Sequence, residues 1–296
     1  MTLPLRPAAL LTALLLLAPG CAPEDAGHDP QGLQVVVSVP PLAGVIGPML
    51  PEGAQVTTLV GPGQSPHGFE LTPSQVSAVR QADIVVLVGL NFEPHVERAL
   101  RASAVQRVLR FADIVGIEAE DDAHDHDHAD HEGHDHGPVD PHLWVDPELV
   151  RQFVIGASGE IEQALGGPPA TDEPTPIQQA RVALVERIAQ LDAQYRQRLE
   201  PFAGEAIVTS HDAFPRLAER YGLRIGAVIQ PIGTQEPTMA SLTAAAEAVR
   251  DAGARAVFVE PQTPSAGARR LASVTGAAVG TLDPLGSVDW FAMMEA

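Results

Sequence analysis

Short apolar runs alternate with helical patterns in two separate halves of this chain, and this alternation restricts the fold more than any other feature of the sequence. Strands that alternate with helices form βαβ units, which build largely parallel sheets. We therefore predict an α/β fold with two lobes, each containing a mostly parallel four-stranded sheet flanked by helices. The predicted strands are Leu33–Val39, Gln55–Val60, Ile84–Gly89 and Val105–Phe111 in the first lobe and Ala206–Ser210, Ile225–Ile229, Ala256–Val259 and Ala278–Leu282 in the second. The predicted helices are Pro73–Ala82, Pro94–Ala102, Pro215–Tyr221, Ser241–Ala252 and Ala266–Thr275.

A long amphipathic segment, Pro174 to Phe202, lies between the two halves. Its apolar residues recur at three- and four-residue steps, and prolines stand at its start and near its end, as at helix boundaries. About 25 helical residues form a rod of about 38 Å. This length suits one long rigid connector helix between the lobes, although a core helix of one large domain would show the same stripe. The stripe consists of Ile177, Leu184, Ile188, Leu191, Tyr195 and Leu199. The predicted division is a first lobe at 33–170, the connector at 174–202 and a second lobe at 203–296.

The N-terminus has the pattern of an export signal. Arg6 precedes an apolar run, Ala8 to Ala18, that has the length of a signal-peptide core and is too short for a convincing membrane span. The run ends at Cys21, the only cysteine, in a sequence that looks like a bacterial lipoprotein cleavage site, although Leu is more usual where Ala18 stands. We predict a signal peptide at 1–21, lipidation of Cys21 and a polar tether at 22–32. Ordinary cleavage near Gly20, which would leave a soluble periplasmic protein, is the alternative.

Charge restricts the partners of the chain. The formal net charge is −20, and arginine supplies every basic residue. Such an acidic protein is repelled by nucleic acid, so we exclude nucleic acid as a partner. We expect a monomer.

A histidine-rich tract interrupts the first lobe in the loop at 120–138. Aspartate and glutamate occupy most of the positions between its histidines, and imidazole and carboxylate are ligands that zinc prefers. The tract has no large apolar residue with which to form a core, so we predict an accessory metal-binding loop; a solvated acidic loop is the alternative. The accessory ligands are His124, His126, His128, His131, His134 and His136.

Four side chains outside the tract form a candidate metal site. His211 and Asp283 directly follow predicted strands of the second half, His67 follows the second strand of the first half, and His142 follows the tract. Ligands of open α/β sheets bind beyond the carboxyl ends of the strands, so two facing lobes would bring these four side chains together. Three imidazoles and one carboxylate make a plausible tetrahedral zinc site.

The same segments resemble those of a known family. The chain is similar to the cluster A-I metal-binding solute-binding proteins of bacterial zinc or manganese ABC importers. The resemblance covers nearly all of Leu33 to Gly286, with the motifs in order. These motifs are Pro66-His67, Gly89-Leu90-Asn91-Phe92-Glu93, Asp140-Pro141-His142-Leu143-Trp144, Ser210-His211-Asp212-Ala213-Phe214, Val259-Glu260-Pro261-Gln262 and Leu282-Asp283-Pro284-Leu285-Gly286.

The resemblance implies a function in transport. It implies two lobes joined by one long helix. It also implies that the residues matching His67, His142, His211 and Asp283 hold a metal ion between the lobes. The protein would deliver that metal to a membrane permease driven by an ATPase. The protein would act outside the cytoplasm, in the periplasm or anchored to a membrane by lipid on Cys21. In the family, zinc binders tend to have histidine at the position of His211, and nitrogen ligands suit zinc better than manganese. Asp140, Asp212 and Glu260 are candidates to orient the histidines, with helix capping as the alternative for Asp212.

Two other functions fit the same residues: a manganese-specific member of the same family, and a surface lipoprotein that buffers zinc without a transporter. We do not expect an enzyme, because four protein ligands would close the zinc site and the sequence has no His-Glu-x-x-His motif.

Two departures from the family pattern stand out. Leu71 replaces a proline, and the chain stops at Ala296, where the family usually has a longer final helix. We expect the apolar residues near that end to cap the second lobe. They are Trp290, Phe291, Met293 and Met294.

Overall fold

The computed structural model describes residues 32–61, 63–105, 107–118, 139–229, 239–262 and 265–296. The predicted signal peptide with Cys21, the predicted tether up to residue 31 and the predicted accessory loop at 120–138 lie outside the described residues.

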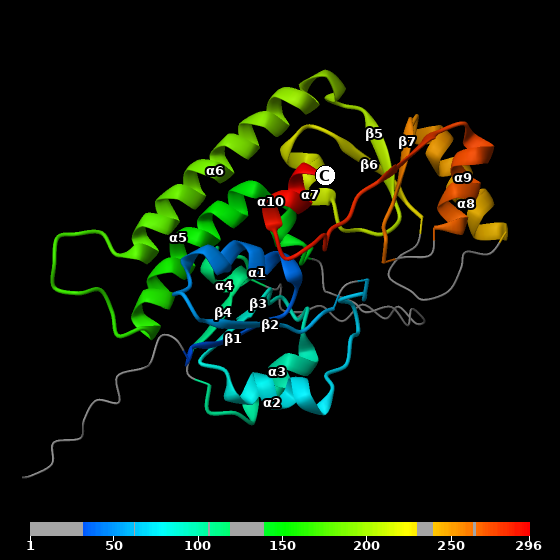
Figure 1. Ribbon diagram of the computed structural model, residues 1–296. Coiled ribbons are helices and arrows are strands. Elements are labelled where there is room, and N and C mark those ends of the chain that lie inside the picture. Colours follow the sequence, from blue (N-terminus) through cyan, green and yellow to red (C-terminus); the bar gives the residue numbers. More distant parts are fainter. Residues whose placement is uncertain (1–31, 62, 106, 119–138, 230–238, 263–264) are drawn as a thin grey trace, which may run out of the picture.

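Two parallel four-stranded sheets form the framework of the molecule (Figure 1). The first has the strand order β2-β1-β3-β4 and the second has the order β6-β5-β7-β8, with every pairing parallel. The predicted α/β fold with two sheets is confirmed. The strands are β1 (Gln34–Val37), β2 (Gln55–Thr58), β3 (Ile84–Leu87), β4 (Arg107–Arg110), β5 (Ala206–Thr209), β6 (Arg224–Val228), β7 (Ala256–Val259) and β8 (Ala278–Thr281).

Helices cover both faces of the first sheet. Every residue of β3 is buried, as expected for a central parallel strand, which is apolar throughout rather than alternating. Helices α2 (Pro73–Gln81) and α3 (Pro94–Arg101) lie below the sheet in Figure 1, and α1 (Pro40–Ile46), α4 (Phe111–Ile114) and α5 (Pro147–Ala164) lie above it. The side chain of Thr72 caps α2 in a capping box with Gln75, so this helix begins where the sequence predicts.

The second sheet has helices α7 (Pro215–Arg220), α8 (Met239–Ala252) and α9 (Ala266–Thr275) around it. Val208, Val257 and Leu271 are each 0% exposed and belong to a separate apolar cluster between this sheet and helices α8 and α9. This small core is aliphatic, as the low aromatic content of the chain predicts.

The predicted connector is helix α6 (Pro176–Leu199), which continues into a 3₁₀ turn, η4 (Glu200–Phe202). Thr175 caps its first turn in a capping box with Gln178, and the buried stripe consists of Leu184, Ile188 and Leu191. Its 24 residues correspond to a length of about 36 Å.

Helix α5, for which the sequence predicts no element, packs along α6 (Figure 1). Gly156 and Gly159 lower the intrinsic helix propensity of this segment. Tertiary packing compensates, because Gly156 lets Ile114 approach the helix backbone closely. The connector is therefore one of a pair of packed helices.

One apolar cluster runs without interruption from the first sheet, past α6, into the second lobe. Trp144 lies at its centre with 0% exposure. The indole Nε1 of Trp144 donates to the carbonyl oxygen of Pro284 at 2.5 Å, and Trp290 Nε1 donates to the carbonyl oxygen of Trp144 at 2.8 Å. Residues from both lobes thus share one core.

The final helix, α10 (Trp290–Glu295), differs from the expectation that it caps the second lobe. It packs against α1 of the first lobe, and the Tyr195 hydroxyl on α6 donates to the Met294 carbonyl oxygen. Trp290 is 1% exposed. Because Trp290 can bury its ring against α1 and also reach Trp144, α10 bridges the lobes.

Within the described residues, each helix is either too short or too polar to span a membrane.

Gly44 on α1 should be required for the docking of α10. A methyl group there would lie 2.5 Å from the Trp290 backbone nitrogen and still closer to the Val288 carbonyl oxygen. We expect Gly44→Ala to lower the free energy of unfolding by about 1–3 kcal/mol in urea denaturation, because backbone atoms on both sides cannot yield. The control is Gly159→Ala, which meets nothing within 4 Å and should stabilise by about 0.4–1 kcal/mol. Equal effects of the two substitutions would contradict this account of the interface.

Candidate metal site

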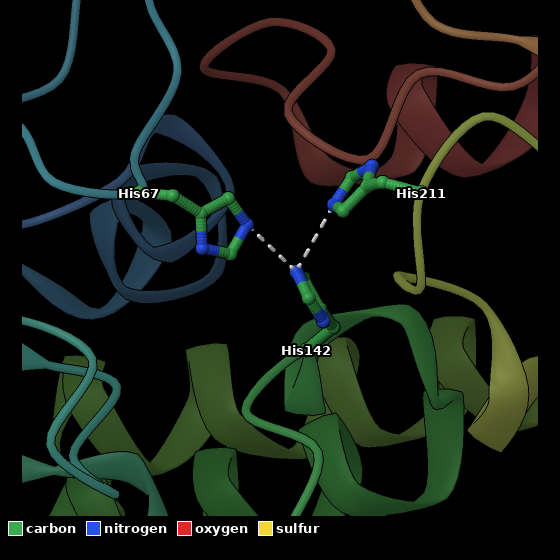
Figure 2. Close-up of side chains that lie close together, drawn as sticks. All are labelled: His67, His142 and His211. Atoms are coloured by element: carbon green, nitrogen blue, oxygen red, sulfur yellow. Dashed lines mark hydrogen bonds between the residues drawn. The ribbon is translucent and has the colours of Figure 1, made fainter. Parts of the chain in front are cut away.

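Three histidines from distant parts of the chain converge, with their rings close to one another (Figure 2). His67 lies in the loop between β2 and α2, and His142 precedes a 3₁₀ turn, η3 (Leu143–Val145), whose residues are all buried. His211 lies just beyond the carboxyl end of β5, where the strand order of the second sheet changes direction. Such a position is where open α/β sheets place their ligands.

The imidazole nitrogens have the spacing of a metal site. His142 Nε2 lies 3.3 Å from His67 Nε2 and 3.4 Å from His211 Nε2. One ligand atom from each of the three residues lies within 4.8 Å of the others. A tetrahedral zinc ion with Zn–N bonds of about 2.0–2.1 Å separates its ligand nitrogens by about 3.3–3.4 Å. The geometry therefore suits a small divalent cation held by three imidazoles.

The burial of the three rings is unequal. His142 is 2% exposed and His211 is 7% exposed, whereas His67 is partly exposed. The His67 side of the site is thus the side nearest to solvent, and an ion would enter there.

Carboxylates orient two of the rings, as the sequence predicts for Asp140 and Glu260. Asp140 Oδ1 lies 2.8 Å from His142 Nδ1 and also accepts a hydrogen bond from the His142 backbone N–H at 2.9 Å. Glu260 Oε2 lies 2.5 Å from His211 Nδ1. A carboxylate beside Nδ1 favours a proton on that nitrogen and leaves a lone pair on Nε2 for a metal.

Asp212, the third predicted orienting residue, is exposed and does not form the cap of helix α7, whose N-cap is Phe214. Although the residue is exposed, the loss of some of the hydration of its carboxyl and the nearby negative charge of Asp140 raise the pKa of that carboxyl. Asp212 therefore adds negative charge near the site, and its predicted orienting role stays a prediction.

Asp283 lies beyond the carboxyl end of β8, as predicted. Among the described residues, the side chains close enough together to share a metal ion are the three histidines, and Asp283 is not in that group. Its Oδ1 accepts a hydrogen bond from Gln262 Nε2 at 2.5 Å and one from the Leu285 backbone N–H at 3.0 Å. The role of Asp283 as fourth ligand stays a prediction.

Two aromatic rings line the site, a feature that the sequence analysis did not predict. The Phe92 ring lies edge-on to His67 with centroids 5.2 Å apart, and the Trp144 ring lies 5.4 Å from that of His142. These contacts restrict the rotation of the His67 and His142 imidazoles.

A left-handed turn places Phe92. Gly89, Leu90 and Asn91 all have positive φ angles, of 88°, 54° and 58°, a conformation that non-glycine residues rarely adopt. The buried carboxylate of Glu93 accepts hydrogen bonds from the backbone N–H groups of Val88 at 2.8 Å and Gly89 at 3.2 Å, which ties the turn together. Burial of Glu93 outweighs these hydrogen bonds and raises the pKa of its carboxyl to about 7.

Arg216 is a further residue near the site that the sequence analysis did not find. It donates two hydrogen bonds to the Asp140 carbonyl oxygen from the other lobe. In the sequence, an arginine in the first turn of a short helix with other charged residues is indistinguishable from a surface charge.

Comparisons with known proteins show which family and fold the chain is similar to. A family model described as zinc-uptake complex component A periplasmic matches residues 35–296. The zinc uptake protein ZnuA of Yersinia pestis is 28% identical over 96% of this chain and 90% of its own length, and the zinc-binding lipoprotein AdcA of Streptococcus pneumoniae is 28% identical over 95% of this chain but only 54% of its own length. The manganese-binding lipoprotein MntA of Halalkalibacterium halodurans is 25% identical over 85% of this chain and 79% of its own length. A crystal structure of ZnuA superimposes with a TM-score of 0.72, at 25% identity, over 89% of this chain and 96% of the other.

Glu93 should make stability depend on pH. Its folded-state pKa of about 7 exceeds the ordinary value of 4.5, so between these values the folded chain binds a proton that the unfolded chain releases. The free energy of unfolding should therefore fall as pH rises from about 4.5 to 7, by up to roughly 3 kcal/mol from this group. Urea denaturation of metal-free protein at pH 5 and pH 7.5 should show this decrease as the difference between the native chain and Glu93→Gln. A pH-independent difference would show that Glu93 is ionised throughout.

Proposed function

Because the chain belongs to the zinc-uptake complex component A periplasmic family, we propose that it is a high-affinity extracytoplasmic zinc-binding protein that delivers Zn²⁺ to an ABC importer. Proteins of this family are metal-binding components of uptake systems and are not enzymes. The observation that carries the proposal is the spacing of the three Nε2 atoms, 3.3 and 3.4 Å, in a largely buried position between two lobes.

The choice of zinc over manganese rests on ligand chemistry. Imidazole nitrogen suits zinc, whereas manganese prefers carboxylate and carbonyl oxygen. All three side chains of the group are histidines. We propose Asp283 as the fourth ligand, which would have to give up its hydrogen bond to Gln262.

The protein would capture its ion rather than transform a substrate. A catalytic zinc site keeps one position open for water, whereas four protein ligands close the site. The aromatic rings of Phe92 and Trp144 and the carboxylates of Asp140 and Glu260 would hold the imidazoles in place before the ion arrives. Such preorganisation reduces the entropy lost on binding and so supports tight capture.

The proposed partners are a membrane permease and its ATPase. A lipid on Cys21 would keep the protein at the outer face of the membrane, next to the permease. The histidine-rich loop, with His124 to His136, would bind further ions more weakly and raise the local zinc concentration.

Zinc stoichiometry tests the proposed cargo. We expect the mature protein with residues 120–138 deleted to retain one zinc ion in native mass spectrometry against a graded chelator. His67→Ala or His211→Ala should weaken binding by more than the 10- to 100-fold that loss of an outer-shell partner typically costs. His95→Ala, on α3, is the matched control and should leave the ion bound. If deletion of the loop removes all bound zinc, the site formed by the three histidines is refuted, and displacement of zinc by equimolar Mn²⁺ would favour manganese as cargo.

The shared core predicts little rotation of the lobes on binding. Trp144 lies in that core and hydrogen bonds to Pro284 and Trp290. We expect spin labels on Arg101→Cys in α3 and Ser273→Cys in α9, in a Cys21→Ser background, to show nearly the same distance with and without Zn²⁺. Trp144→Phe, which removes the indole donor, should broaden the distance distribution. A rotation of the size seen in hinge-closing proteins would refute this prediction.

A further inference from the structure

Arg216 connects the second lobe to the metal site of the first. It lies in the first turn of α7, and its Nε and Nη2 atoms donate to the Asp140 carbonyl oxygen at 3.2 and 2.8 Å. The same Nε lies 3.4 Å from Asp140 Oδ2. The guanidinium therefore hydrogen bonds to the backbone of Asp140 and forms an ion pair, without a hydrogen bond, with its carboxylate, and the Asp140 side chain is only 18% exposed.

Asp140 in turn determines the orientation of His142. Its other carboxylate oxygen, Oδ1, is occupied by His142 through both the backbone N–H and Nδ1. One carboxylate thus faces Arg216 with Oδ2 and His142 with Oδ1. If Asp140 rotated, the proton on His142 Nδ1 would lose its acceptor, and Nε2 would no longer be held toward His67 and His211.

Other charged groups cannot replace this contact in the described part of the chain. Arg220, the next cation on α7, pairs with Asp146 and Asp192. Glu260 lies beside His211, and Asp212 is a further carboxylate near the site. Among the arginines of the described residues, Arg216 is the one that forms an ion pair with Asp140.

We propose that Arg216 is a positioning residue for the metal site: by holding Asp140 across the gap between the lobes, it keeps His142 in the Nδ1–H tautomer with Nε2 directed at the ion. Metal affinity then depends on the contact between lobes, although Arg216 does not touch the ion. This inference rests on the proposed function, because it assigns a determinant of affinity to the same site.

Two physical effects of Arg216 have opposite signs, which makes the inference testable. Removal of a positive charge would by itself strengthen the binding of a cation. Removal of an outer-shell support typically weakens metal binding 10- to 100-fold. A loss of affinity on neutral substitution therefore indicates positioning, and a gain indicates a charge effect alone.

The experiment compares zinc affinity, by chelator competition, of the full-length protein and Arg216→Met. We expect Arg216→Met to weaken zinc binding by about 10- to 100-fold. Arg216→Lys should weaken zinc binding less, because lysine keeps the positive charge but cannot donate from two atoms of a guanidinium. The matched control is Arg224→Met: Arg224 also donates its Nε to a carbonyl oxygen, that of Gly204 at 3.0 Å, within the second lobe. This control should change affinity by less than about twofold. Unchanged or increased affinity in Arg216→Met would overturn the inference.

A double-mutant cycle tests whether Arg216 acts through Asp140. If it does, Arg216→Met should have little further effect in an Asp140→Asn background, because directly interacting residues are non-additive. Fully additive losses would refute the pathway through Asp140.

The tautomer of His142 in the zinc-free protein gives a readout that needs no metal. Long-range ¹H–¹⁵N correlation spectra should show the proton on Nδ1 in the native chain and a mixture of tautomers in Arg216→Met. If the native chain binds no zinc, the proposed function fails while this measurement still decides the positioning role. An unchanged tautomer in Arg216→Met would refute the positioning role even if zinc binds.

Discussion

The packing of Trp144 between the two lobes is the interaction on which the rest of the structure depends. Its ring is fully buried, its indole N–H reaches Pro284 in the second lobe, and its carbonyl oxygen accepts from Trp290 at the end of the chain. A buried indole that lacks a hydrogen-bond partner is costly, so these bonds favour one arrangement of the lobes. His142 lies two residues before Trp144 and is carried into place by the same packing.

This packing explains how loops from three places can form a site with ångström accuracy. The three histidines lie in loops or beside turns, which are usually the more variable parts of a fold. Here a neighbouring side chain supports each histidine. Asp140 and Trp144 contact His142, Glu260 contacts His211, and Phe92 packs against His67. The supports come from both lobes, so the geometry of the site and the contact between the lobes are coupled.

This arrangement places three acidic side chains in buried or partly buried positions, and a neighbouring group stabilises each carboxyl. Asp140 faces Arg216, Glu260 faces an imidazole, and Glu93 accepts two backbone N–H groups while its pKa rises. A bound dication would add to this compensation for the carboxylates beside the histidines. The site is therefore expected to be more stable when loaded than when empty, since a ligand that binds only the folded state stabilises it.

The sequence by itself determined the strands, most helices and the candidate ligands, because each depends on local pattern. Short continuous apolar runs indicate the strands, apolar spacing of three to four residues indicates the helices, and residues just past parallel strands gather at one edge of a sheet. It did not determine α5, whose two glycines lower its helix propensity and which forms only as Ile114 packs closely against it at Gly156, or the docking of α10 on α1. It also did not reveal the pairing of Arg216 with Asp140, or whether Asp283 faces the histidines or Gln262. These features depend on contacts between residues far apart in the chain, and only the tertiary structure brings those residues together.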